Sequence, residues 1–171
     1  MKRIAFWLIA VAIVAGLPAS TLPASGAADE ESAPLFGIKI PPGYRDWKLI
    51  SVAHEEGSLN DFRAILGNDE AIKAFREGNH PFPDGSIIAR LAWKYVASEE
   101  NNKAFGRSQS FVAGPPINLQ LMVKDSGKYA ATDGWGFAQF TNGKPDNEAV
   151  HKTCAPCHAK TRDLVFTHYA P

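Results

Sequence analysis

The sequence has only two cysteines, Cys154 and Cys157, among its 171 residues. Two thiols form one disulfide at most, which excludes a disulfide-rich scaffold, and a zinc site built from four cysteines is excluded as well. An excess of charge is also lacking, because 18 basic residues balance 18 acidic residues. We therefore expect the chain to bind neither nucleic acid nor an anionic membrane surface.

Long hydrophobic runs are missing too, since no apolar segment reaches the roughly 20 residues that a membrane-spanning helix needs. The longest run, 4–17, follows Lys2 and Arg3 and precedes small residues at 24–28. This layout is typical of a secretory signal. We predict a signal peptide over 1–28, a disordered lead-in over 29–40 and one domain over 41–171, exported in bacteria to the periplasm. A retained N-terminal anchor is the alternative.

The two cysteines belong to a C-x-x-C-H run that ends at His158. Two thiols at this spacing add across the two vinyl groups of a haem, and the imidazole of the next residue reaches the iron. We predict one covalently attached haem c, bound by Cys154 and Cys157, with His158 as the iron ligand. A redox disulfide and another metal site are alternatives, but no thioredoxin-like strand precedes the motif, and His151 lies too close to it for a usual zinc finger.

Alternating apolar residues and closely spaced turn signals predict an α+β fold with an antiparallel sheet. The expected strands are 47–54, 62–66, 86–97, 110–113, 117–124 and 135–140. A few helices are expected to pack on the sheet. One covers 69–77, with acidic residues in its first turn and Gly78 after its end. The other runs from about Asp146 through the cysteine motif, so His158 would project from a C-terminal haem-attachment helix.

Two of the expected strands carry polar residues on one side. In 86–97, Arg90 and Lys94 alternate with a purely apolar set, and in 117–124 Gln120 does the same. Either this mixed side faces water, or one of the cations points into a haem cavity. Candidates for a sixth iron ligand are Met122, His54, His80, His151 and His168.

Several short motifs occur together in a specific order. They are P-x-x-Y-R-x-W at 41–47, F-P-D-G at 82–85, V-K-D-S at 123–126, W-G-F at 135–137, C-x-x-C-H at 154–158 and L-V-F-T at 164–167. In these motifs the chain resembles the cytochrome P-460 family over about 41–169. The resemblance implies a homodimer of sheet-rich subunits, each with a five-coordinate haem that has a histidine on one side and an open pocket on the other. Members of the family either oxidise hydroxylamine or bind nitric oxide and similar small ligands.

The resemblance transfers unevenly to the pocket. Oxidising members carry a lysine, joined to the haem, five residues after the Asp-Gly turn, and here that residue is Arg90. A guanidinium is a poor nucleophile, so we expect no such crosslink. The position of a proton-accepting carboxylate aligns with Gln120, which cannot act as a base. Arg63 matches a pocket arginine, although a strand residue facing water is the alternative.

These residues predict a periplasmic monohaem cytochrome with a five-coordinate iron that binds small nitrogen species such as nitric oxide or hydroxylamine. Arg63, Arg90 and Gln120 would supply hydrogen bonds to the ligand. The second hypothesis is a hydroxylamine-oxidising enzyme with a haem crosslinked to Lys94, which would deliver electrons to a periplasmic electron-transfer protein. The third is a simple electron-transfer cytochrome c with Met122 or a histidine as sixth ligand.

Overall fold

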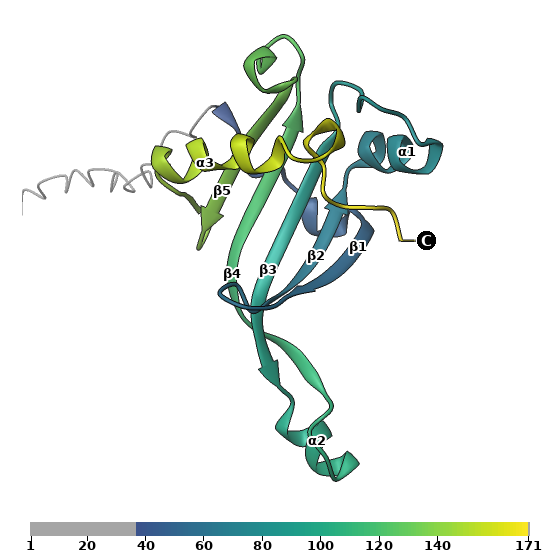
Figure 1. Cartoon of the computed structure of the whole chain (residues 1–171), viewed down its shortest axis with the longest axis vertical. Coiled ribbons are helices and arrows are strands. Elements are labelled where there is room, and N and C mark those ends of the chain that lie inside the picture. Colours follow the sequence, from purple (N-terminus) through teal and green to yellow (C-terminus); the bar gives the residue numbers. More distant parts are fainter. Residues whose placement is uncertain (1–36, 171) are drawn as a thin grey trace, which may run out of the picture. The chain divides into compact units, whose positions relative to one another are not determined.

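The computed structural model describes residues 37–170, so the predicted signal peptide lies outside the described residues. The strands are β1 Lys48–Glu55, β2 Asp61–Gly67, β3 Ile87–Ala97, β4 Phe111–Lys124, β5 Trp135–Thr141 and β6 Lys144–Pro145. The helices are α1 Asp69–Glu77, α2 Glu99–Phe105 and α3 Glu148–His158, with short 3-10 turns at Tyr44–Asp46, Ala130–Thr132 and Arg162–Leu164. All neighbouring strands are antiparallel and follow chain order, which confirms the predicted α+β class (Figure 1).

Local sequence signals explain where the two predicted helices begin and end. The side chain of Asn68 accepts a hydrogen bond from the backbone N–H of Ala71, and Gly78 ends α1 in the left-handed conformation. Asn147 caps α3 in the same way. The structure therefore confirms the two predicted helices, over 69–77 and from about residue 146 through the cysteine motif. Within the described residues, no helix has the length and apolar character needed to span a membrane.

The prediction of two short strands at 110–113 and 117–124 is wrong, because β4 is continuous. Its first half pairs with β3, whereas its pairing with β5 begins only at Leu119. One edge of the first half therefore carries no neighbouring strand, and Pro115, which lacks an N–H group, is tolerated there. Helix α2 was not predicted, although Ser98 caps its start and Gly106 ends it. It connects β3 to β4 at the tip of a projecting arm (Figure 1).

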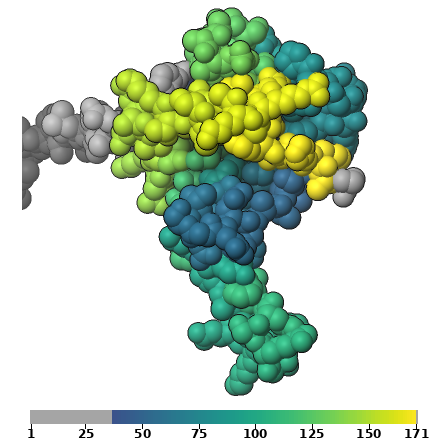
Figure 2. Space-filling model, in the orientation of Figure 1, coloured from purple at the N-terminus to yellow at the C-terminus, as the bar shows by residue number. Residues whose placement is uncertain are grey.

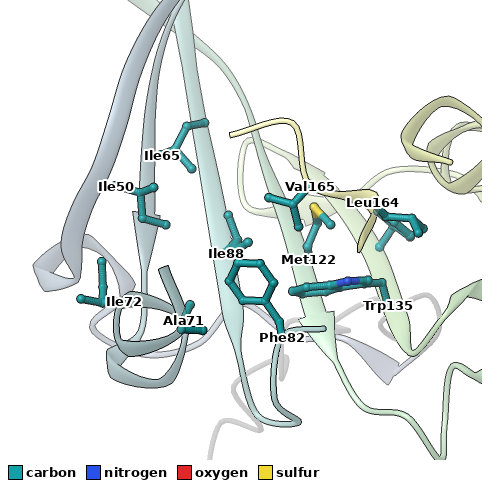
Figure 3. Close-up of a cluster of buried hydrophobic side chains, with 12 residues drawn as sticks. Ile50, Ile65, Ala71, Ile72, Phe82, Ile88, Met122, Trp135, Leu164 and Val165 are labelled. Carbon is teal, nitrogen blue, oxygen red and sulfur yellow. The ribbon is translucent and has the colours of Figure 1, made fainter. Parts of the chain in front are cut away.

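The two faces of the sheet bury separate cores. On one face, which we call the α3 face, helix α3 and the C-terminal segment 165–170 cross in front of the strands (Figures 1 and 2). Its core includes Phe137 as well as Met122 and Trp135, which are labelled in Figure 3. Helix α1 packs against the same core with Ala71 and Ile72. On the opposite face, Leu91 and Leu121 pack against residues of the N-terminal segment such as Ile38. β3 therefore buries apolar side chains on both sides, and not on one side only.

Cross-strand pairing places the side chains of the α3 face in rows about 7 Å apart. The first row is apolar and consists of Phe137, Met122 and Ile88. The second row consists of Gln139, Gln120, Arg90 and Ile65, and the third of Asn118, Ala92 and Arg63. The α3 face thus changes from apolar to polar within two residues along each strand.

Candidate functional site

Helix α3 holds the cysteine motif at the apolar end of the α3 face. Cys154 and Cys157 are free thiols three residues apart, so they lie on neighbouring positions of one helix side. Cys154 is half-buried against the core, whereas Cys157 is exposed. Burial raises the pKa of the Cys154 thiol, and the neighbouring Cys157 adds to this effect. A raised pKa disfavours the reactive thiolate that a redox disulfide would use.

The ring of His158 lies between two phenylalanines, 5.0 Å from the ring of Phe137 and 5.1 Å from that of Phe166. Its Nδ1–H donates a 2.6 Å hydrogen bond to the backbone carbonyl of Leu164. A carbonyl oxygen only accepts, so the proton must sit on Nδ1 and the lone pair on Nε2. Burial lowers the pKa of His158, against the opposing effect of this hydrogen bond, and favours the neutral ring. A neutral imidazole fixed through its other nitrogen is the usual form of a metal ligand.

A charged cluster occupies the polar end of the α3 face. The carboxylate of Asp61 is almost fully buried and accepts hydrogen bonds from Arg63 Nε at 2.7 Å and Arg90 Nη2 at 2.8 Å. Arg63 also pairs with Glu55 at 3.0 Å, and Arg90 Nη1 donates to Asn118 Oδ1 at 3.0 Å. Burial lowers the pKa of Arg90, with Arg63 adding to the effect and Asp61 opposing it. The guanidinium nevertheless stays charged at any working pH.

Gln120 lies directly opposite Arg90 on the neighbouring strand. Its Nε2 donates to Gln139 Oε1 at 2.5 Å, and Gln139 in turn donates to Asp146. These hydrogen bonds engage the Nε2 end of the Gln120 amide. The Oε1 atom of Gln120 remains the end with hydrogen-bonding capacity to spare.

The structure thus brings the three sequence-predicted pocket residues together on one face. Arg90 and Gln120 are direct cross-strand partners, and Arg63 is joined to Arg90 through Asp61. Sequence reasoning missed Asp61, although it stands two residues before Arg63 and therefore on the same side of β2. It also missed Gln139, which stands two residues after Phe137 on β5.

The candidates for a sixth iron ligand are scattered. Met122 is buried in the first row and packs in the core. His54 stacks on Tyr95 at 3.9 Å and lies on the opposite face of the sheet, since its cross-strand partner Phe62 pairs with Trp93. Exposed residues are His80, next to the Phe82 ring, and His168, near the C-terminal end.

The buried ring of His151 is held by backbone groups on both sides. Its Nε2 accepts from the N–H of Gln139 at 2.8 Å, and its Nδ1 lies 2.9 Å from the Asn147 carbonyl. These contacts join α3 to β5 and give the histidine a structural role. Lys94, the candidate for a crosslink, is exposed at the outer edge of the cluster, across from Asp61.

A family model described as Cytochrome P460 matches residues 41–167. The chain belongs to the cytochrome P460 family. The matched span includes every strand of the sheet, the charged cluster and the whole cysteine motif. The protein is thus a c-type cytochrome of the P460 type, and the family implies a haem cofactor. No curated protein matches the chain.

Proposed function

We propose that this cytochrome P460 is a periplasmic protein that binds small nitrogen species, such as nitric oxide or hydroxylamine, at a five-coordinate haem. The observation that carries the proposal is the state of His158. Its Nδ1–H is committed to the Leu164 carbonyl, and its Nε2 lone pair is available for iron. When bound, the haem would supply an iron with one open position for the ligand.

The residues of α3 fit a covalently attached haem. The spacing of Cys154 and Cys157 suits two thioether bonds to one macrocycle, and His158 follows directly as the iron ligand. The rings of Phe137 and Phe166 both contact the imidazole and help to hold its orientation. Both attachment and ligation are therefore proposed for these three residues of the motif.

The polar end of the α3 face supplies hydrogen bonds to the ligand. A guanidinium has five N–H donors, and the hydrogen bonds of Arg90 to Asp61 and Asn118 engage only two of them. Arg90 and Arg63 can therefore donate to a bound ligand or to a haem propionate. Gln120 contributes its Oε1 atom as an acceptor. Asp61 holds both guanidiniums in place.

The charge pattern favours ligand binding over hydroxylamine oxidation. Oxidation requires a group that takes up protons, and Asp61 is the carboxylate in the cluster with the deepest burial. Both oxygens of its carboxylate already accept hydrogen bonds, from Arg63 at 2.7 Å and from Arg90 at 2.8 Å, so they are engaged within the protein and not turned toward a ligand. The oxidising enzyme with a haem crosslinked to Lys94 remains the second candidate. It would need a periplasmic electron-transfer protein as electron acceptor.

The deciding experiment is the visible spectrum of the purified, reduced holoprotein. We expect broad high-spin features, uptake of carbon monoxide and nitric oxide, and an intact mass that fits two thioethers only. A sharp low-spin α band without uptake of either gas would instead show an electron carrier. A displaced red band, an additional crosslink by mass and turnover of hydroxylamine with an electron acceptor would show the oxidising enzyme.

Export and a homodimer are proposed alongside this function. Cleavage near residue 28 would appear in the mass of protein recovered from the periplasmic fraction.

For the dimer, the arm formed by β3, α2 and β4 exposes the apolar side chains of Phe105, Phe111 and Val112, and such patches often mark interfaces. Sedimentation should show a dimer for the unaltered protein. The Phe111→Ser variant should dissociate into monomers at a higher protein concentration than the unaltered protein does. A monomer at all concentrations would contradict the proposal.

A further inference from the structure

The short turn after α3 has an unusual backbone. Asp163 has φ 49° and Leu164 has φ 56°, so two consecutive residues are left-handed. Aspartate adopts this conformation fairly readily, but for a leucine it is an outlier that the surrounding contacts must maintain. This conformation presents the Leu164 carbonyl to Nδ1 of His158. The orientation of the proposed iron ligand thus depends on a backbone conformation that leucine does not favour.

The carboxylate of Asp163 ties this turn to three other segments. Oδ1 accepts from Lys124 Nζ at 2.9 Å on β4 and from Trp135 Nε1 at 3.2 Å on β5. Oδ2 accepts from the backbone N–H of Phe82 at 2.6 Å. The ion pair with Lys124 is buried, since 5% and 6% of the two side chains are exposed. Figure 3 shows Leu164 beside the ring of Trp135, with Phe82 on the other side of that ring.

We call the carboxylate of Asp163 with its three donors, Lys124, Trp135 and the N–H of Phe82, the Asp163 clamp. Because these groups only donate, position 163 requires a carboxylate. Lys124 Nζ donates in addition to the Asp133 carbonyl at 2.8 Å, which fixes its position independently of Asp163. An amide at position 163 would direct an NH₂ group at one of these donors. The donor would lose its acceptor, and a buried unsatisfied donor drives the local structure to rearrange.

We propose that Asp163 is a positioning residue for His158, acting through the carbonyl of Leu164. The inference rests on the proposed role of His158 as iron ligand. When the ring nitrogen that does not face the metal, here Nδ1, donates a hydrogen bond to a carbonyl, the bond orients the imidazole and increases its basicity toward the metal. Without the Asp163 clamp, Leu164 relaxes toward a right-handed or extended backbone, and its carbonyl turns away. His158 then becomes a weaker and less well oriented electron donor.

The test compares Asp163→Asn with the unaltered holoprotein by resonance Raman spectroscopy of the reduced form. The iron–histidine stretching frequency should fall, and the reduction potential should rise, because the ferric state loses more from a weaker donor. Ile72→Ala is the matched control. Ile72 is 2% exposed and belongs to the same core, but it lies on α1 and does not contact the turn through any hydrogen bond. It should lower the melting temperature and leave the frequency unchanged.

Trp135→Phe is a second variant in case Asp163→Asn does not fold. It removes one donor to Asp163 and keeps an aromatic ring, so we expect a smaller shift in the same direction. A frequency unchanged in Trp135→Phe and in any folded Asp163→Asn protein overturns the inference and leaves the proposed function intact. A shift of equal size in Ile72→Ala also overturns it. If the unaltered reduced protein shows no iron–histidine band, the proposed function fails and the inference with it.

Discussion

The two ends of the α3 face bury charge in different ways. At the apolar end, the carboxylate of Asp163 meets one cation, Lys124, and both side chains are about 5% exposed. At the polar end, the carboxylate of Asp61 meets two cations, Arg63 and Arg90, each 16% exposed. The first arrangement uses nearly all of its hydrogen-bonding groups within the protein. In the second arrangement, Arg90 retains N–H donors that are not used by Asp61 or Asn118.

This difference indicates that one end of the face is held rigidly and that the other can adjust. Groups near His158 are bonded to backbone atoms of several segments, which suits a ligand that must not move. Groups around Arg90 are bonded mainly to other side chains, which can shift when a small molecule arrives. Under the proposed function, the first end would hold the haem and the second would adapt to the ligand of the haem. The predictions below alter each end separately.

The largest effect is expected when haem attachment at the apolar end is removed. The double variant Cys154→Ser and Cys157→Ser has no thiol to form a thioether, so all covalent haem should be lost. Haem staining after denaturing electrophoresis measures this directly. Each single variant is the matched control and should keep haem through one bond. Covalent haem in the double variant would contradict the role of both cysteines.

At the polar end, Asp61→Ala should cause the largest loss of stability. It leaves two partly buried guanidiniums without their shared anion, and breaking a buried pair in this way costs about 3–5 kcal/mol. Glu55→Ala is the control, because Glu55 contacts the same Arg63 but its side chain is 47% exposed. An exposed pair contributes about 0–1 kcal/mol. Urea unfolding should separate the two variants, and equal losses would show that Asp61 is not the centre of the cluster.

Much of this comparison was accessible from the sequence. Alternation placed Arg90 and Gln120 each on the polar side of its strand, and the acidic first turn and Gly78 predicted the bounds of α1. The cysteine motif gave the position of His158. These signals are local, because they depend on strand and helix periods and on the conformations that individual residues prefer.

The rest depends on features that are not local. The pairing of Asp61 with Arg90 follows from the register of β2 on β3, which depends on how the two strands pair in the folded sheet. The role of Asp163 depends on a left-handed backbone at Leu164, a residue that gives no turn signal. Continuity of β4 through Pro115 required knowing that β5 stops short of it. Tertiary contacts decide each of these cases.

A smaller effect is expected from changes to the spare donors and acceptors. Arg90→Met removes the guanidinium closest to Gln120, and a hydrogen bond to a charged group contributes about 1.5–3 kcal/mol. Carbon monoxide or nitric oxide should therefore dissociate from the reduced protein at least about tenfold faster. Lys94→Met is the control, since Lys94 lies on the same strand but is exposed. Flash photolysis and stopped-flow mixing measure both rates, and equal rates in all three proteins would remove Arg90 from the pocket.

The smallest effect concerns Asp84, an exposed carboxylate that also holds two segments together. The hydroxyl of Ser126 donates to it at 2.6 Å and the Ser126 N–H at 2.8 Å, which lowers the pKa of Asp84, the hydroxyl contributing most. The folded state therefore prefers the ionised form. Its stabilisation is complete above the unfolded pKa of about 3.9 and is lost as the pH falls through the lower folded value.

Asp84→Asn should remove this part of the acid dependence. Urea unfolding at pH 6 and at successively lower pH should give the unaltered protein a steeper loss of stability below about pH 4 than the variant. Because Asp84 is exposed, the difference should be slight. Identical acid profiles would show that the Ser126 contacts do not persist in solution. A large difference would show that exposure does not weaken the contact between Asp84 and Ser126.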